Sequence, residues 1–375
     1  MRVHIDRIKS YDSEKLEQYF STLFDREKLG DKLRGKESVL LKPNLLGGHK
    51  PEKGVTTHPV VMRSLIRVLK AKRIRNIRIG DSPGGTARIE SVYEITGMKA
   101  VAEAEEVELL NFGKSGVKRL NRDGFELWID SQVLEAPAII NLAKYKTHSL
   151  TMFTGAVKNL FGTVPGLKKS DYHRLYPDPE RFAAMLVALY QQLRSQVVLN
   201  IVDGIWGMEG EGPSSGKPRQ FGVMFASESA SALDYVAAAM MGFKSKTIPT
   251  VIYSMRNDDL LTDDIEIGQE WENFVFPKVK RGRGSLYSSF INRVPKFVRK
   301  LFYRLYNYYP AFNSKCRLCR ICAESCPVQV ITIKDGASTP EIDYSHCIKC
   351  MCCYEFCPYG AVYIKKTLLA KIILS

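Results

Sequence analysis

Cysteine is absent from the first 315 residues of this 375-residue chain. All nine cysteines lie between Cys316 and Cys357, so their chemistry belongs to a small C-terminal segment. The chain also lacks an uninterrupted run of about eighteen apolar residues, which argues against a membrane-spanning helix. The N-terminal residues contain no apolar segment of a secretory signal. We therefore expect a protein of the reducing cytoplasm, where disulfides are rare.

Acidic residues are missing from residues 273 to 323, although this stretch carries twelve Lys or Arg and most of the net charge of +15. Within it, residues 278–312 combine cations with apolar side chains spaced by three and four, as in an amphipathic helix. Three interpretations stay open: a linker helix packed on a main domain, a helix lying on the anionic inner face of a membrane, or a docking surface for an acidic redox partner protein. No segment resembles a nucleic-acid reading element, so nucleic acid is not an expected partner.

The cysteines form two copies of one spacing. Residues 316–327 follow the pattern C-x-x-C-x-x-C-x-x-x-C-P, and residues 347–358 repeat it. In bacterial ferredoxins, three cysteines of such a run bind one [4Fe-4S] cluster and the fourth binds the other. The pattern predicts one cluster on Cys316, Cys319, Cys322 and Cys357, and a second on Cys347, Cys350, Cys353 and Cys326.

Two other interpretations of the cysteines fit less well. A disulfide framework expects an even count and a secretory signal, and zinc usually takes two separated C-x-x-C pairs or mixed Cys and His ligands. The ninth cysteine, Cys352, is expected to be a bystander beside Cys353, with ligand exchange between the two left open. Short strands are expected on either side of Asp335-Gly336, and the internal repeat indicates a ferredoxin-like α+β module that depends on its metal for folding.

The first part of the chain alternates strand-like apolar runs with helical patterns, which predicts an α/β domain with a mixed sheet covered by helices. A hairpin turning at Asp123-Gly124 adds an antiparallel piece. The expected strands are 37–45, 76–82, 107–112, 136–144, 195–205 and 221–227, and the expected helices are 59–73, 179–194 and 229–241. The expected organisation is an α/β domain at 1–277, the basic aromatic linker at 278–312, a two-cluster module at 313–367 and a tail at 368–375.

Polar residues follow several of these strands, at the place where open α/β sheets bind ligands. The stretch GDSPGG (80–85) offers glycine backbone for contact with an anion and a carboxylate in Asp81, or else is only a turn. It is neither a P-loop nor a dinucleotide-binding fingerprint. Residues 144–173 carry five lysines and two histidines among small and apolar side chains, with Asp171 as the one acid. This composition predicts a pocket for an anionic small molecule, with a solvated basic loop as the alternative.

The candidate catalytic residues are His148, Lys146, Lys158 and Asp81, with His148 or a lysine of lowered pKa as the proton donor. The candidate binding residues are Lys42, Asn44, Gly80, Asp81, Ser82, Gly84, Gly85, Lys144, Asn159, Lys168 and His173. A second glycine-rich stretch, 202–219, offers Asp203, Glu209 and Glu211, which either bind a metal or orient the lysines, or belong to a flexible lid.

Several of these stretches together resemble a known family. KPNLL, TTHP, GDSPGG, KTHSLTMFTGAVKNLFGTVPGLKK and VDGIWGMEGEGPSSGKP are similar to the family catalogued as domain of unknown function 362, whose members often carry a two-cluster ferredoxin module. The resemblance covers roughly residues 35 to 245 and the C-terminal module, and the insert at 278–312 departs from it. It implies an iron-sulfur protein with a redox role.

Three functions are compatible with these features. The first is an oxidoreductase that passes electrons from two [4Fe-4S] clusters to an anionic substrate or cofactor held in the α/β domain. The second is an electron-transfer subunit that docks an acidic redox partner. The third is a non-redox, anion-binding enzyme with structural clusters. No flavin or nicotinamide fingerprint is visible, so the identity of any organic cofactor stays open.

Overall fold

The computed structural model describes residues 1–282 and 308–366. The strands of the first range are β1 (His4–Arg7), β2 (Val39–Lys42), β3 (Ile77–Asp81), β4 (Glu108–Asn111), β5 (Val117–Arg122), β6 (Phe125–Asp130), β7 (Ile139–His148), β8 (Met152–Thr154), β9 (Val197–Glu209) and β10 (Lys217–Ser227). Its α-helices are α1 (Ser13–Arg26), α2 (Leu29–Leu33), α3 (Pro59–Ala71), α4 (Ile89–Ile95), α5 (Met98–Ala104), α6 (Ser131–Leu134), α7 (Ala156–Asn159), α8 (Lys168–Leu175), α9 (Pro179–Leu193), α10 (Ala230–Met240) and α11 (Pro249–Asn257).

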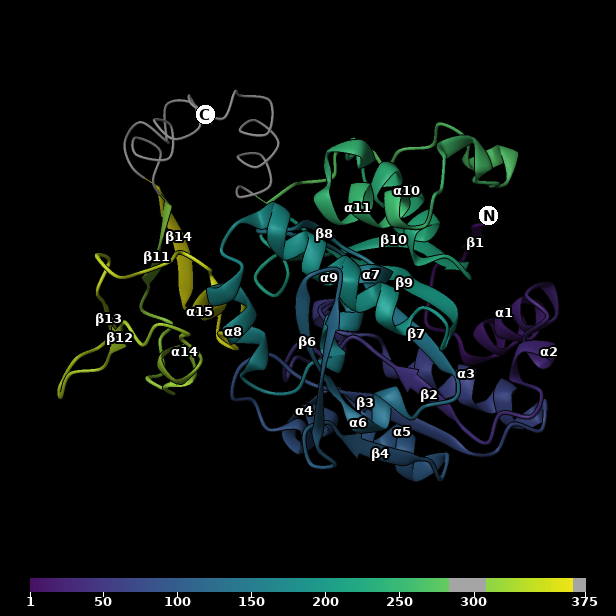
Figure 1. The fold of residues 1–375 in the computed structure, drawn as a ribbon, viewed down its shortest axis with the longest axis horizontal. Coiled ribbons are helices and arrows are strands. Elements are labelled where there is room, and N and C mark those ends of the chain that lie inside the picture. The colour runs from purple at the N-terminus through teal and green to yellow at the C-terminus, as the bar shows by residue number, and fades with distance from the viewer. Residues whose placement is uncertain (283–307, 367–375) are drawn as a thin grey trace.

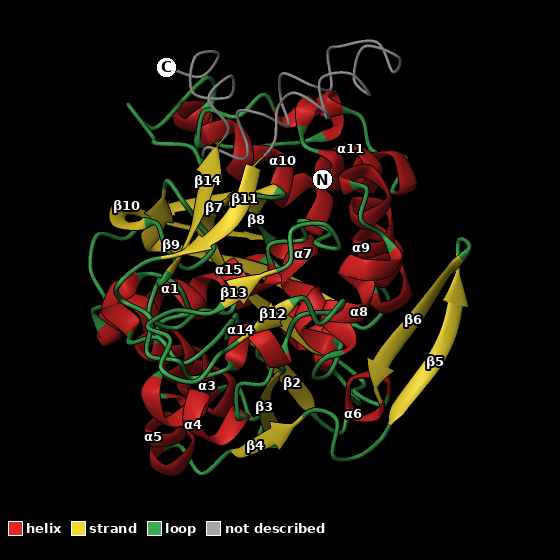
Figure 2. Ribbon diagram, turned by 90° about the vertical axis from the view of Figure 1, so that its left-hand side faces the viewer, coloured by secondary structure: helices red, strands yellow, loops and turns green. Residues whose placement is uncertain are grey.

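Eight of these strands form one mixed sheet in the order β1-β10-β9-β7-β2-β3-β4, with β8 paired to β7 (Figure 2). The pairs β2–β3, β2–β7, β3–β4 and β7–β9 are parallel, and β1–β10, β9–β10 and β7–β8 are antiparallel. From β2 the sheet grows to β3 on one side and to β7 on the other. The carboxyl end of β2 is therefore the topological switch point, where such sheets bind ligands.

Helices cover both faces of the sheet (Figure 1). Along β2, Leu40 faces one hydrophobic core, whereas Val39 and Leu41 face the other, the alternation that a strand imposes on its side chains. The first core packs the sheet against α7, α9, α10 and α11, and the second packs it against α1, α3, α4 and α5. Because both faces are covered, the central strands β2, β7 and β9 are buried along almost their whole length.

The expected α/β architecture is confirmed, and each expected strand and helix of this domain is present, with ends that differ by a few residues. The hairpin β5–β6 turns at Asp123 and Gly124, which both have positive φ, as a two-residue hairpin requires. It extends outside the large sheet (Figure 2). Helix α1 was not among the expected helices. Asp12 caps it by accepting hydrogen bonds from the N–H groups of Glu14 and Lys15.

The C-terminal module is a small unit built around its cysteines. Its elements are β11 (Tyr308–Phe312), α14 (Ile321–Glu324), β12 (Ile331–Thr332), β13 (Glu341–Ile342), α15 (Cys352–Glu355) and β14 (Val362–Lys366). Antiparallel pairs join β11 to β14 and β12 to β13. Its hydrophobic core is small, and three of its nine buried residues are cysteines. Among the described residues, no helix combines the length and the apolar character needed to cross a bilayer.

One boundary of the sequence interpretation needs correction. Residues 283–307 of the expected linker lie outside the described residues, as does the expected tail at 368–375. The last five residues of the expected linker, Tyr308–Phe312, are not helical but form β11, which pairs with β14. Pro310 has no N–H to continue a helix, and an edge strand tolerates it.

Candidate functional site

A small cavity lies where β2, β3 and β7 end, at the switch point of the sheet. Lys42 and Asp81 are the last residues of β2 and β3, and His148 ends β7. The cavity has a volume of about 60 Å³, which is room for several waters or one small anion.

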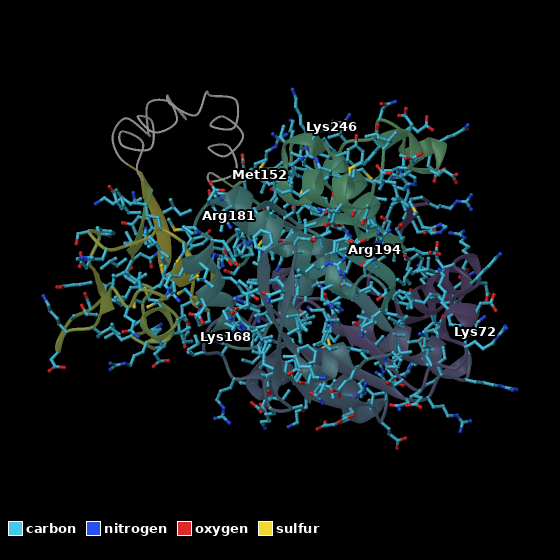
Figure 3. The ribbon with its side chains drawn as sticks, viewed as in Figure 1. Lys72, Met152, Lys168, Arg181, Arg194 and Lys246 are labelled. Carbon is cyan, nitrogen blue, oxygen red and sulfur yellow. The ribbon has the colours of Figure 1, made fainter. Side chains whose placement is uncertain are left out.

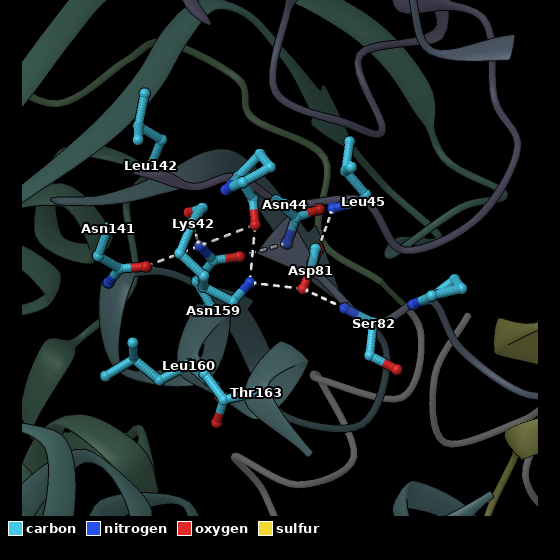
Figure 4. Close-up of polar contacts among 12 residues, drawn as sticks. Lys42, Asn44, Leu45, Asp81, Ser82, Asn141, Leu142, Asn159, Leu160 and Thr163 are labelled. Atoms are coloured by element: carbon cyan, nitrogen blue, oxygen red, sulfur yellow. Dashed lines mark hydrogen bonds and ion pairs between the residues drawn. The ribbon is translucent and has the colours of Figure 1, made fainter. Parts of the chain in front are cut away.

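Lys42 and Asp81 form a buried ion pair on one wall of the cavity (Figure 4). The Nζ of Lys42 lies 2.8 Å from Oδ1 of Asp81 and donates to the carbonyl of Pro43 at 2.7 Å. Asp81 also accepts from the N–H groups of Ser82 and Leu45, at 2.9 and 2.6 Å. Burial lowers the pKa of Lys42, and the Asp81 carboxylate opposes that shift. Because its oxygens are engaged, Asp81 acts here as the partner that holds Lys42.

A chain of side-chain amides links the strand ends (Figure 4). Asn44 donates to Oδ1 of Asn159 at 2.9 Å, and Asn159 donates to Oδ1 of Asn141 at 2.8 Å. Lys146 donates to Oδ1 of Asn44 at 3.0 Å and to the carbonyl of Val55 at 2.7 Å. Two of its three N–H bonds are thus engaged, and one is left for a ligand. Burial, with the charges of Lys158 and Lys144 adding to it, lowers the pKa of Lys146 well below its usual value.

His148 presents a hydrogen-bond donor to the cavity. Its Nδ1 accepts from the N–H groups of Leu150 and Thr151, at 3.1 and 3.2 Å. The neutral ring therefore carries its proton on Nε2. Burial, reinforced by Lys158 and Lys146, lowers its pKa well below the usual range and keeps the ring neutral. Nε2 lies 3.3 Å from Oε1 of Glu355, yet neither atom has an aligned hydrogen-bond partner among the described residues.

Two further lysines and a histidine line the same cavity. Lys158 has no hydrogen bond or ion pair to any described residue, and its Nζ lies 5.7 Å from the centre of the Phe161 ring. Burial lowers its pKa, and the charge of Glu355 opposes this. Lys169 donates to the carbonyls of Ser82 and Pro83, at 2.9 and 3.1 Å, and burial lowers its pKa to about 7. His173 stacks on a phenylalanine, and burial lowers its pKa to about 3.

The C-terminal module closes the cavity. Glu355, the last residue of α15, and the following Phe356 both line it. The Phe356 ring packs against Gly84 and Gly85, where a Cβ on Gly84 would overlap the ring. Burial raises the pKa of Glu355, while Lys158 and Lys146 oppose that shift. The glycines of GDSPGG therefore admit a side chain of the other domain at the mouth of the cavity.

Polar contacts hold the module in this position. Thr86 donates to Oε2 of Glu324 at 3.2 Å. Tyr354 donates from its hydroxyl to the carbonyl of Glu211 at 2.7 Å, and Ser214 donates to the carbonyl of Glu355 at 3.2 Å. The glycine-rich stretch 202–219 thus contributes to the contact between the two domains.

Most predicted site residues meet at this cavity, but some lie elsewhere. The predicted residues that line it are Lys42, Asn44, Asp81, Ser82, Gly84, Lys146, His148, Lys158, Asn159 and His173. Gly80 lies against the Phe112 ring instead, and Gly85 lies at the contact with the module. Lys168, which is labelled in Figure 3, is exposed instead, with its Nζ 3.6 Å from Oδ2 of Asp171 and 4.4 Å from the centre of the Trp128 ring.

Lys144 belongs to a separate buried cluster. Its Nζ lies 2.7 Å from Oδ2 of Asp203 and 2.9 Å from the hydroxyl of Tyr11. Asp203 accordingly orients a lysine, one of the roles expected for it. Glu209 instead pairs with Arg219 at 2.7 Å.

The sequence interpretation did not name Lys169, Thr154, Glu355 or Phe356 as site residues, although all four line the cavity. Lys169 was visible in the sequence as part of the basic stretch. The sequence could not distinguish it from its exposed neighbour Lys168, because the two differ only in the direction that α8 gives their side chains. Glu355 and Phe356 lie between cysteines of the second run, and no local pattern assigns them to a cavity in another domain.

The cysteines divide into the two sets that their spacing predicts, each around its own cavity. Cys316, Cys319, Cys322 and Cys357 line one, and Cys326, Cys347, Cys350 and Cys353 line the other. In both runs the second residue after the first cysteine has positive φ, Leu318 and Lys349. The N–H of Leu318 points at the sulfur of Cys316, 3.5 Å away. Four cysteines around a shared cavity, with an amide directed at sulfur, fit an iron-sulfur cluster.

The ninth cysteine, Cys352, is buried and lines the cavity of the second set. It begins α15, the helix whose last residue, Glu355, lines the basic cavity. Cys352 therefore belongs to the helix that connects the second cysteine set with the basic cavity. Whether it is a bystander or exchanges with Cys353 stays a prediction.

Comparisons with known proteins agree with this two-part architecture. A family model described as a domain of unknown function, DUF362, matches residues 39–239, and the model of a 4Fe-4S dicluster domain matches residues 315–361. A thylakoid-associated protein of Synechocystis sp. is 34% identical over 253 residues, which are 66% of this chain and 77% of that protein. The structure of the lactate racemase apoprotein from Thermoanaerobacterium thermosaccharolyticum is similar with a TM-score of 0.38 and 15% identity, over 60% of this chain and 53% of that chain.

Proposed function

The chain belongs to the family of domain of unknown function 362 and carries a 4Fe-4S dicluster domain at its C-terminal end, and on this premise we propose that it is an oxidoreductase. In this proposal the module binds two [4Fe-4S] clusters, which supply single electrons when bound. The basic cavity of the α/β domain holds the small anion that receives them. The module and the cavity thus form one functional unit.

The observation that carries the proposal is the position of α15 and Phe356. Cys353 and Cys357 line the two cysteine cavities, whereas Glu355 and Phe356, which lie between them in sequence, line the basic cavity. Electrons therefore have a short path from either cysteine set to the cavity. A subunit that only carries electrons to another protein has no need of a buried basic cavity closed by its own cluster module.

The side chains of the cavity favour a small oxyanion or carboxylate as the ligand. Four lysines line the cavity, three of them buried and Lys158 half-buried, and they face only two carboxylates, of which Asp81 is already engaged with Lys42. Nε2 of His148 and the hydroxyl of Thr154 are buried with no aligned partner among the described residues, and Lys158 makes no hydrogen bond or ion pair to these residues. Buried donors of this kind gain most when an anion satisfies them. Lys158 and His148 are thus the groups we assign to hold the anion and to donate a proton to it.

A redox titration followed by EPR tests the electron-transfer part of the proposal. Protein purified without oxygen is expected to contain about eight iron atoms per chain and to show two clusters with midpoints near or below about −400 mV. Iron is counted on the same sample, so that incomplete loading is recognised. If the clusters cannot be reduced within the accessible range of potentials, their role is structural and the proposal is contradicted.

Anion binding is expected to weaken as the pH rises through the pKa of Lys169. Its pKa is lowered to about 7, chiefly by burial and further by Lys42 and Lys158, while Asp81 opposes the shift. Lys169 is therefore protonated below this pH and neutral above it, and a bound anion favours the protonated form. Sulfate keeps its charge over this range. For each unit by which bound sulfate raises the pKa of Lys169, we expect sulfate to bind about tenfold more weakly at high pH than at low pH. Titration calorimetry at several pH values measures this.

Two neighbouring lysines provide a matched pair for that experiment. Lys169→Met is expected to remove the pH dependence, and Lys168→Met to leave it unchanged, because Lys168 points to solvent. Lys158→Met is expected to abolish sulfate binding at every pH while the iron content stays the same. Equal binding by Lys158→Met and the unsubstituted protein would show that the anion does not occupy this cavity.

A further inference from the structure

The two cysteine cavities differ in their access to solvent. All nine cysteines lie within the described residues, and Cys319, of the first set, is the exposed one among them. The loop around it, from Lys315 to Arg320, is exposed except at Cys316. In the second set Cys353 is buried and the others are partly buried. The first set is therefore the one that a protein in solution can approach most closely.

The second set adjoins the basic cavity through α15. This helix carries Cys352 and Cys353, which line the second cysteine cavity, and ends at Glu355, which lines the basic cavity. Cys357 of the first set directly follows Phe356, so both sets lie close along the chain to residues of the basic cavity.

The exposed loop at the first set is basic. We define the entry surface as Lys315, Arg317, Leu318, Arg320 and Tyr359. Its three cations make no side-chain hydrogen bond or ion pair within the described parts of the chain, and residues 308–323 contain no acid. Leu318 and Tyr359 are 37% and 49% exposed and, like Cys319, line the first cavity. Apolar side chains at the centre of a charged surface are typical of protein interfaces.

We propose that the entry surface docks a small, acidic one-electron carrier protein, which reduces the cluster held by Cys316, Cys319, Cys322 and Cys357. One electron leaves the reduced carrier, which is thereby oxidised, and reduces that cluster by one electron. Complementary charge speeds such encounters and makes them sensitive to salt, and interfaces for electron transfer are small. The proposal rests on the electron-relay part of the proposed function and places electron entry at the exposed loop of the first set.

A charge-reversal pair on the entry surface tests the proposal. The probe is an acidic flavodoxin in its reduced state, mixed in a stopped-flow apparatus with the cluster-loaded full-length protein. Arg317→Glu/Arg320→Glu is expected to slow the second-order reduction about tenfold or more at low salt and to abolish its decline with rising salt. The control is Lys244→Glu/Lys246→Glu, which makes the same charge change at two exposed lysines of the main domain and is expected to have little effect.

Reduction by methyl viologen, a small cation, separates docking from cluster chemistry. Viologen is expected to reduce the Arg317→Glu/Arg320→Glu clusters no more slowly than those of the unsubstituted protein. If the flavodoxin also reduces them at an unchanged rate with unchanged salt dependence, the entry surface is wrong while the relay survives. If viologen cannot reduce the clusters of the unsubstituted protein, both proposals fall. If the charge-reversal variant loads no clusters, the milder variant Arg317→Gln/Arg320→Gln is used instead, and its loss of reduction rate is expected to be intermediate. The binding of oxidised flavodoxin to this variant provides the same comparison without electron transfer.

Discussion

Replacing Asp203 by alanine is expected to lower the free energy of unfolding by about 3–5 kcal/mol, because it leaves a buried lysine without its counter-charge. The side chains of Lys144 and Asp203 are 0% and 1% exposed, and their charged atoms lie 2.7 Å apart. Asp203 also accepts from the hydroxyl of Tyr11 and from the N–H of His58, at 3.1 and 3.2 Å. The substitution therefore removes an ion pair and leaves polar groups unsatisfied in one step.

Urea unfolding followed by tryptophan fluorescence measures this loss, because all three tryptophans lie in the first 282 residues. The double variant Asp203→Ala/Lys144→Met is expected to recover much of the stability, since it removes the stranded charge. A surface control, Glu135→Ala, breaks the exposed contact with Lys118 and is expected to change the free energy of unfolding by about 0.5 kcal/mol or less. A loss below about 1 kcal/mol for Asp203→Ala would show that the pair is not as isolated from water as its burial indicates.

Removing iron from the protein is expected to unfold the C-terminal module and to leave the α/β domain folded. The core of the module has only nine buried residues among those described, three of them cysteines, and β12 and β13 are two residues long each. A unit of this size buries too little apolar surface to be stable alone. Metal binding then supplies its folding free energy. The larger domain has two extensive cores of its own and needs no metal for them.

Limited trypsin digestion before and after chelation of iron tests this expectation. Rapid cleavage is expected at lysines and arginines of the module, such as Arg317, Lys334 and Lys349, only after chelation. Tryptophan fluorescence serves as the internal control and is expected to stay native. An apo-module that resists trypsin as well as the loaded one would show that its apolar contacts suffice. Unfolding would also remove Glu355 and Phe356 from the basic cavity, so sulfate binding is expected to change in the same sample.

The two cysteine sets and the position of the polar motifs at strand ends were predictable because both follow from short-range rules. Spacing alone assigned Cys357 to the first set and Cys326 to the second, and each lines the expected cavity. Lys42, Asp81 and His148 each end a strand, and the ends of adjacent parallel strands necessarily meet. The alternation of apolar, strand-like runs with helical patterns likewise predicted the covered sheet.

Side-chain direction and contacts between distant segments were not predictable in this way. Lys168 and Lys169 are neighbours of the same type in one basic stretch, yet only Lys169 reaches the cavity, because α8 presents successive residues about 100° apart. Lys144 is a β7 residue like Lys146, but it meets Asp203 on β9 instead of the cavity.

By itself, the sequence determined the iron-sulfur module, the α/β class of the main domain and the strand ends at which a site would form, because each rests on a local, periodic pattern. Only the tertiary structure decided that Glu355 and Phe356 close the basic cavity, with the ring of Phe356 against Gly84 and Gly85. These contacts join residues some 270 positions apart, and they depend on how two separately folded domains pack. No local periodicity encodes such a contact.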